Sequence, residues 1–214
     1  MTQDQSPVWS DQFRTELEHL MRWRRDVRRF ESRSVGEDVL MKCLHIACLG
    51  PSVGNSQPWR LVRVNAVDRL QKIYDNFKRA NNKALINPGV QVTNYAALKL
   101  EGIVDAPIQI SVFVDADTQT GHGLGSQTMP ETKAYSTVCM IQSLWLLLRA
   151  HGIGLGWVSI LNPEEMNRDL GVSEDWTFIG HLCIGYPQES SDVPELETVG
   201  WQSRLDFDNF IIDR

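Results

Sequence analysis

Five arginines and one aspartate are gathered in the nine residues RWRRDVRRF, residues 22–30. An arginine guanidinium presents a planar fork of donors that matches phosphate oxygens two at a time. We expect Arg24, Arg25 and Arg28 to converge on a phosphate if the chain leaves its helix there. Asp26, set among these cations, is a candidate base or proton-positioning group. The alternative is that its carboxylate only relieves repulsion among the arginines.

Two other interpretations of the cluster come from charge alone. Arginines near the C-terminus of a helix interact favourably with its dipole, which is sufficient explanation for Arg22 and Arg29. Nucleic-acid binding is disfavoured, because the 214-residue chain carries a net charge of −6 and the basic patch is local. A compact anion, such as the phosphate of a small molecule, suits the cluster better.

Two further stretches have residue types that bind ligands. The loop PSVGNSQPW, residues 51–59, is dense in hydroxyls and amides, and a binding loop and an ordinary polar connection are equally favoured. The glycines of GIGLGW, residues 152–157, follow a helical pattern and precede a strand pattern. A dinucleotide-binding fingerprint has the opposite order, so a tight turn is the better interpretation.

The elements that must position these residues alternate between helical and strand patterns along the chain. We predict helices from Ser10 or Asp11, after a capping box at Ser34 and Glu37, and from Pro163 with Asn162 as its cap. Further predictions are a long buried helix over residues 131–150, strands in RLVRV, PIQISVFVD, GLGWVSIL and FIGHLCIGY, and a lid in KRANNKALINPG, residues 78–89. We found no linker or repeat, which favours one α+β domain over residues 1–214.

Composition excludes several classes of protein. The four cysteines have no CxxC spacing and the five histidines are scattered, so we expect reduced thiols, a cytoplasmic location and no metal site. The N-terminus has no basic-then-apolar signal. The most apolar run, residues 138–160, is interrupted by polar residues and glycines, so no membrane interaction is expected.

The ordered set of motifs resembles the flavin-dependent nitroreductase superfamily. The set consists of RRDVRRF, GPSVGNSQPWRLVRV, DAPIQISVFVD, a long helix, GIGLGWVSIL and a late GWQSR, and it covers the chain from about residue 10 to its end. The resemblance implies an α+β fold with a central mixed sheet flanked by helices. It also implies an interlocked homodimer that binds FMN at the subunit interface, partly through residues of each chain.

The same resemblance implies which residues bind the flavin. The phosphate-binding arginines of the family match Arg24, Arg25, Arg28 and Arg204. The full implied set is Arg24, Arg25, Asp26, Val27, Arg28, Pro51, Ser52, Asn55, Leu100, Val158, Ser159, Ile160, Ser203 and Arg204.

Asp26 replaces a serine that most members of the superfamily have. This aspartate, together with GWVSIL and the stretch MPETKAYSTVCMIQSLWLLLRAHGIGLGWVSIL, resembles one branch that makes 5,6-dimethylbenzimidazole, the lower ligand of vitamin B12. In that branch reduced FMN is a substrate, which dioxygen fragments to the benzimidazole and erythrose 4-phosphate. The implied catalytic residues are Asp26, kept ionised by the arginines, and Ser159, whose alternative role is a hydrogen bond to a neighbouring strand. A separate flavin reductase would supply the reduced flavin.

Two other functions stay open at this point. One is a conventional NAD(P)H-dependent nitroreductase or a deiodinase-like oxidoreductase that retains its FMN. The other is a flavin-binding protein without turnover. The aspartate at position 26 speaks against both, because neither gives that carboxylate a task.

Overall fold

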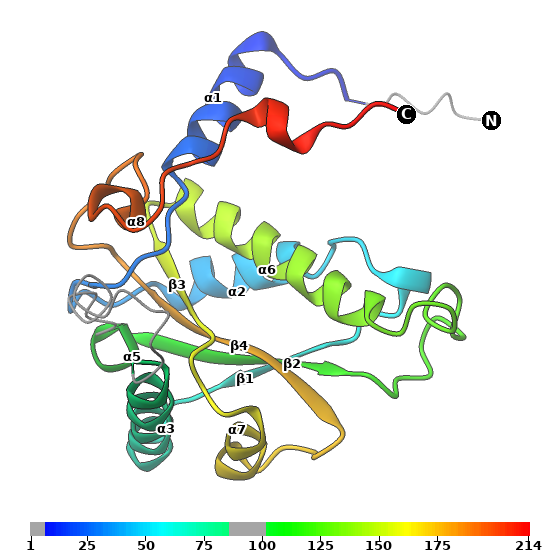
Figure 1. Cartoon of the computed structure of the whole chain (residues 1–214), viewed down its shortest axis with the longest axis vertical. Helices are drawn as coiled ribbons and strands as arrows, with labels where there is room; N and C mark the ends of the chain where they lie inside the picture. Colours follow the sequence, from blue (N-terminus) through cyan, green and yellow to red (C-terminus); the bar gives the residue numbers. More distant parts are fainter. Residues whose placement is uncertain (1–6, 86–101) are drawn as a thin grey trace.

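The chain folds as an α+β domain, as its pattern of elements predicts. The computed structural model describes residues 7–85 and 102–214 (Figure 1). The strands are β1 (Trp59–Arg63), β2 (Ile108–Asp115), β3 (Gly154–Val158) and β4 (Trp176–Gly185). The α-helices are α1 (Asp11–Trp23), α2 (Glu37–Ala47), α3 (Val67–Leu85), α5 (Gly102–Asp105), α6 (Thr132–Ala150), α7 (Pro163–Leu170) and α8 (Glu195–Thr198).

The described strands form one sheet in the order β1-β2-β4-β3. All three strand pairs are antiparallel, which differs from the mixed sheet that we expected. The parallel pairing in this sheet is a single bridge between Asp26 and Leu155, because the segment after α1 is too irregular to form a strand. β3 is therefore an edge strand whose free side receives the arginine-rich segment.

Helices cover both faces of the sheet (Figure 1). On one face α2 and α6 pack against the strands through a cluster that includes Leu40, Met140 and Leu144, all fully buried. On the other face α3 and α7 form a second cluster around Ile73 and Met166. Burial of this much apolar surface on two faces stabilises the sheet as the middle layer of the domain.

Helix α1 and the C-terminal segment extend away from this layered body and lie beside each other (Figure 1). Ser10 caps α1 as predicted, because its hydroxyl accepts a hydrogen bond from the amide of Phe13 at 3.1 Å. The helix buries none of its residues, and Phe13, Leu17 and Met21 are 40–50% exposed. The apolar side chains of the tail are also exposed: Leu205, Phe207, Phe210, Ile211 and Ile212. We call α1 and residues 201–214 the arm.

Two predictions about helix ends are wrong. Ser34 does not cap α2; the N-cap is Gly36, and Glu37 forms an ion pair with Arg63 at 2.6 Å instead of completing a capping box. The proposed lid, residues 78–89, continues α3 as far as Leu85, because the run of Lys, Arg, Ala and Asn is compatible with a helix. Its last four residues lie outside the described part of the chain. None of the described helices is long and apolar enough to cross a membrane.

Candidate active site

The arginine-rich segment lies against β3 because two glycines leave room for it. The amide of Val27 donates to the carbonyl of Leu155 at 3.1 Å. A Cβ atom on Gly156 would lie 2.1 Å from the carbonyl oxygen of Val27, and one on Gly154 would lie 2.6 Å from its side chain. A glycine inside a strand often marks such a close approach. The tight turn that we predicted explains only Gly152, which has a φ of 72°.

This approach places the carboxyl of Asp26 over the end of β3. Its Oδ1 accepts a hydrogen bond from the Trp157 amide at 2.9 Å, and its Oδ2 lies 3.5 Å from Nε of Arg28. The side chain of Asp26 is 36% exposed, whereas that of Arg28 is 11% exposed. The carboxyl thus has one fixed oxygen, a close cationic neighbour in Arg28 and one open edge.

The balance of forces on this carboxyl differs from our expectation. Burial raises the pKa of Asp26, and the Trp157 amide and the Arg28 guanidinium oppose that rise without cancelling it. We expected the arginines to lower the pKa and keep the carboxylate ionised. The correction has a physical cause: the surrounding protein removes water from the carboxylate, which disfavours its charged form. A raised pKa brings a carboxyl closer to the range in which it can accept and return a proton.

Arg24 and Arg25 are held beside this carboxyl by backbone and aromatic contacts. The Arg24 guanidinium lies over the ring of Trp145 at 4.6 Å, and Nε1 of Trp145 donates to the carbonyl of Arg25 at 3.2 Å. The Arg25 guanidinium donates to the carbonyl of Asp192. Burial and the positive charge of Arg204 both lower the pKa of Arg24 and Arg25. The structure thus brings Arg204 close to the pair, although it lies about 180 residues further along the sequence.

Arg28 is arranged differently, since it is already paired. Its Nη1 lies 3.3 Å from Oε2 of Glu195, and Oε1 of the same carboxylate lies 3.1 Å from Nη2 of Arg29. Our sequence analysis missed Glu195 in α8. No local pattern identifies it, because the contact spans more than 160 residues. The Nε of Arg28 is a buried donor without a hydrogen-bond partner among the described residues, so it can donate a hydrogen bond to a ligand oxygen.

A cavity of about 320 Å³ opens along this segment. Its lining residues include Trp23, Arg25, Asp26, Arg28, Arg29 and Glu195. A smaller hollow lies behind Asp26 and is lined by Gly102, Trp157, Val158 and Cys183. Small-molecule sites are commonly of the larger size, with a few polar groups that fix orientation. The guanidinium groups at its wall fit the phosphate of a flavin mononucleotide, and Asp26 is within the same cavity.

The remaining candidate residues near β3 are less enclosed. Val158 ends the strand and is buried, whereas Ser159 is exposed and Ile160 is half-buried just beyond it. Ser203 and Arg204 are exposed in the tail. Leu100 lies outside the described residues. The segment after β3 leads to α7, where Asn162 accepts from the amide of Glu165 as the sequence predicts.

The loop with Pro51, Ser52 and Asn55 is in a different place. It begins after α2 and leads into β1, and the Val53 amide donates to the Ser136 hydroxyl in the first turns of α6 at 3.0 Å. Asp26, by contrast, lies near Trp145 and β3, toward the other end of that helix (Figure 1). None of these three loop residues lines either cavity around Asp26.

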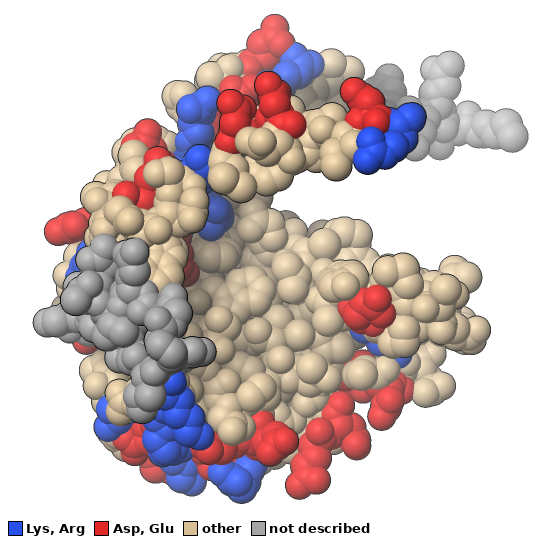
Figure 2. Space-filling model, viewed as in Figure 1, with Lys and Arg blue, Asp and Glu red and all other residues tan. Residues whose placement is uncertain are grey.

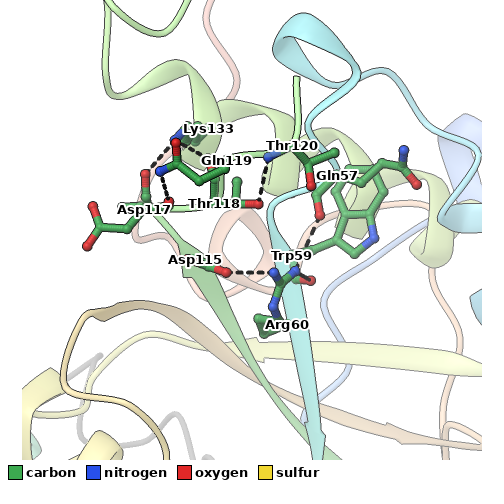
Figure 3. A network of polar contacts seen from close by, with 10 residues as sticks. Gln57, Trp59, Arg60, Asp115, Asp117, Thr118, Gln119, Thr120 and Lys133 are labelled. Carbon is green, nitrogen blue, oxygen red and sulfur yellow. Dashed lines mark hydrogen bonds and ion pairs between the residues drawn. The ribbon is translucent and has the colours of Figure 1, made fainter. Parts of the chain in front are cut away.

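A polar network fixes the surroundings of that loop (Figure 3). The Arg60 guanidinium pairs with Asp115 at 2.6 Å and donates to the carbonyl of Trp59 at 3.0 Å. Lys133 in α6 donates to the carbonyls of Ala116 and Thr118. The network joins β1, the end of β2 and the start of α6, so the loop is presented by a rigid frame.

The chain is similar to known proteins over most of its length. The family model described as Nitroreductase family matches residues 21–186. A protein of Rhodospirillum rubrum named 5,6-dimethylbenzimidazole synthase is 49% identical, over 92% of this chain and 94% of the relative. A protein of Rhodobacter capsulatus with the same name is 42% identical, over 90% of this chain and 93% of the relative.

Among solved structures, the fold is similar to a crystal structure of oxidized iodotyrosine deiodinase bound to FMN and 3-iodo-L-tyrosine. The TM-score is 0.69 with 20% identity, covering 82% of this chain and 91% of the other. At that identity the likeness concerns the fold.

Proposed function

This chain belongs to the nitroreductase family and, within it, groups with relatives named 5,6-dimethylbenzimidazole synthase; on that premise we propose that it has the same activity. The proposed reaction is the oxygen-dependent fragmentation of reduced FMN to 5,6-dimethylbenzimidazole and erythrose 4-phosphate, with the pyrimidine part of the flavin ring leaving as a third, oxidised fragment. FMN is then a substrate that is consumed, and dioxygen is the second substrate. A separate flavin reductase supplies the reduced flavin in this proposal.

The observation that carries the proposal is the position of the Asp26 carboxyl. One of its oxygens is fixed by the Trp157 amide, and the other faces Arg28 within a cavity lined by arginines. Breaking the chain between the flavin ring and its sugar requires removal of a proton, and a carboxyl with a raised pKa and an open edge suits that task. An enzyme that only passes electrons through FMN does not need this group.

The remaining assignments follow from charge and position. We assign the phosphate to Arg24, Arg25, Arg28 and Arg204. Arg25 and Arg28 line the cavity, and Arg204 is close enough to Arg24 and Arg25 for its charge to lower their pKa. Val27, Val158 and Ile160 supply apolar contact near the flavin. Ser159 stays a candidate hydrogen-bond donor to the reacting part of the substrate, and its exposure in one chain leaves its hydroxyl available. Ser203 is adjacent to Arg204.

We propose that the complete site is formed by two chains. Within one chain Pro51, Ser52 and Asn55 lie apart from the Asp26 cavity, so the residues that the family resemblance assigns to one flavin are divided between two places. The exposed apolar side chains of the arm support a partner that covers them. Figure 2 shows a recess between the arm and the body whose visible walls are almost free of charged side chains. A second copy of the chain fits these features as a homodimer partner.

The decisive assay supplies purified protein with FMN, a chemical reductant and air. We expect the yellow FMN chromophore to be lost in a molar amount at least equal to that of the protein. Mass spectrometry should then detect 5,6-dimethylbenzimidazole. A parallel assay offers NADPH and a nitroaromatic compound. Turnover of the nitroaromatic with intact FMN, and no benzimidazole, would identify a conventional nitroreductase instead. Binding of FMN without either product would leave only a flavin-binding protein.

Asp26→Asn is the direct test of the catalytic carboxyl. The amide keeps the shape of the side chain and the oxygen that accepts from Trp157, but it does not take up a proton. We expect product formation to fall at least about 100-fold while the dissociation constant for FMN changes by less than about fivefold. Product at the wild-type rate would show that Asp26 has no catalytic role.

A further inference from the structure

Glu195 connects the Asp26 site to a segment that follows the sheet. We call residues 186–199 the strap. Its first half is attached to the arginine-rich segment by three hydrogen bonds. They run from the Glu31 amide to the carbonyl of Tyr186 at 2.8 Å, from the Gln188 amide to the carbonyl of Arg29 at 3.1 Å, and from Nε2 of Gln188 to the carbonyl of Phe30 at 2.8 Å. The strap is thus anchored without any contribution from Glu195.

The carboxylate of Glu195 is shared between two guanidinium groups. One oxygen lies 3.3 Å from Nη1 of Arg28, and the other lies 3.1 Å from Nη2 of Arg29. The Nε of Arg28 lies 3.5 Å from the carboxyl of Asp26. Arg28 therefore lies between two carboxylates. Glu195 holds its guanidinium from the strap, and Asp26 lies beside it at the active site.

We propose that Glu195 is a positioning residue that holds the Arg28 guanidinium against Asp26 and so sets the pH range in which Asp26 is ionised. The inference rests on the proposed function of Asp26 as the base. An arginine side chain has several rotatable bonds, and a charged partner at its far end selects one arrangement. The Arg28 side chain is only 11% exposed, so the arrangement is enclosed by protein and weakly screened.

Two effects of Glu195 on Asp26 have opposite signs, which makes the proposal testable. Its negative charge alone disfavours a second negative charge at Asp26 and raises the pKa of that carboxyl. By holding Arg28 close, it favours the ionised form and lowers the same pKa. If Glu195 acts mainly by positioning, its removal lets Arg28 turn away, and ionisation of Asp26 then requires a higher pH. If it acts mainly by its charge, its removal has the opposite result.

The first measurement is the pH profile of single-turnover product formation with reduced FMN and dioxygen. For Glu195→Ala we expect a rate about tenfold lower at the acid end of the profile and within about twofold of wild type on the high-pH plateau. Glu195→Gln retains an oxygen that accepts from Arg28, so we expect a smaller change in the same direction. Glu31→Ala removes an exposed carboxylate next to the arginine-rich segment, from a side chain that lines neither cavity and has no ion pair among the described residues, and should keep the wild-type profile.

A double-mutant cycle separates action through Arg28 from a general effect on the strap. In an Arg28→Ala background Glu195 has nothing to position and only the direct effect of its charge remains, so adding Glu195→Ala should leave the profile of Arg28→Ala unchanged or move it toward lower pH. The proposal is overturned if the profile of Glu195→Ala is unchanged or moves toward lower pH. It is also overturned if Glu195→Ala has the same effect with and without Arg28.

A second readout does not depend on the reaction. Aspartate labelled with ¹³C at the carboxyl carbon reports ionisation by NMR, and Asp26→Asn identifies the signal of Asp26. The Asp26 signal in Glu195→Ala should titrate at higher pH than in wild type. If wild type makes no benzimidazole but this shift occurs, the proposed function fails and the positioning role stands. If wild type makes benzimidazole and the signal does not move, only the positioning role fails.

Discussion

Asp26 and His181 are two titratable groups beside β3 to which we assign different roles. Asp26 has one open edge in a cavity, and its neighbours leave its pKa raised, as suits proton transfer. His181 is fully buried in β4, and burial lowers its pKa to about 4. Among the described residues, His181 lines neither of the two cavities, and burial is the cause of its lowered pKa. We therefore assign His181 a structural task.

The hydrogen bonds of His181 define its protonation state. Its Nδ1 lies 2.8 Å from the hydroxyl of Ser111, and its Nε2 lies 2.8 Å from Oε1 of Gln109. The side-chain amide of Gln109 donates to the carbonyls of Gly102 and Ile103, which begin α5, and of Ala106, which follows it. Because Oε1 of Gln109 only accepts, the proton of the neutral imidazole is on Nε2. The network ties α5, and with it the wall behind Asp26, to the sheet.

The lowered pKa of His181 predicts an acid-sensitive fold. His181 takes up a proton near pH 4 in the folded state but already near its ordinary pKa of 6.5 in the unfolded chain. Stability is therefore lost as the pH falls from 6.5 toward 4. Between pH 7.5 and 4.5 we expect this group to remove about 2–3 kcal/mol from the free energy of unfolding. Urea denaturation at the two pH values measures the loss, and His181→Gln should lack this part of it. Equal losses in both proteins would contradict the assignment.

At the scale of elements, the site depends on how closely the arginine-rich segment approaches β3. Gly156 faces the backbone of Val27, so the space for even one methyl group is absent. We expect Gly156→Ala to displace the segment, destabilise the fold by about 1–3 kcal/mol and weaken FMN binding at least about tenfold. Thermal unfolding and quenching of FMN fluorescence measure the two effects.

Gly152→Asn is a matched control from the same glycine-rich stretch. Gly152 has a positive φ, which asparagine tolerates better than most residues, and a Cβ there meets nothing within 4 Å. The control should keep both stability and FMN binding close to wild type. Equal losses in the two variants would show that the turn, and not the close approach to Val27, is what the glycines provide.

Elements with local signals could be predicted from the sequence. Asn162 and Pro163 start α7 as expected, because a cap and its helix are adjacent in the chain. The capping box at Ser34 failed because Glu37 found a stronger partner in Arg63, which lies in β1. A glycine inside a strand pattern is the signal for a close backbone approach, but we interpreted Gly154 and Gly156 as parts of a tight turn.

Long-range placement in the site was harder to predict. The family resemblance selected Asp26 and its arginines. In the structure Arg204 is close enough to Arg24 and Arg25 for its charge to lower their pKa, and their binding of a phosphate stays a prediction. The family resemblance gave no role to Glu195. The strap follows the whole sheet in the sequence and meets the arginine-rich segment only in the folded chain. The direction of the Asp26 pKa was also mispredicted, since residue types reveal neighbouring charges but not the amount of water that the fold removes.

At the scale of the molecule, the residues that we propose for the flavin site lie in two separate places on one chain. The Asp26 cavity lies near the C-terminal part of α6, and the loop with Ser52 and Asn55 lies near its N-terminal part. The arm leaves the body with its apolar side chains exposed, above the recess of Figure 2. A partner that enters this recess can bring its own loop to the Asp26 cavity. The active unit in this proposal is the dimer, with two sites of mixed origin.

Complementation between two inactive variants tests this arrangement. Asp26→Asn removes the base, and Asn55→Asp adds a negative charge to the loop while tolerating the positive φ of 54° at that position. If each site takes Asp26 from one chain and Asn55 from the other, a mixed dimer has one doubly altered site and one unaltered site. Random mixing of equal amounts then gives about a quarter of wild-type benzimidazole formation.

The experiment co-expresses the two variants with different affinity tags and assays the doubly purified mixed dimers, in which about half of the wild-type activity should return. Each variant alone must be inactive by at least about 100-fold for the comparison to hold, and wild type carrying both tags sets the upper limit. A site built from one chain has either Asp26 or Asn55 altered in every copy, so it recovers nothing on mixing. Inactive mixed dimers would therefore place both halves of the site within a single subunit. They would also contradict our proposal that the exposed arm is covered by a partner that completes the site.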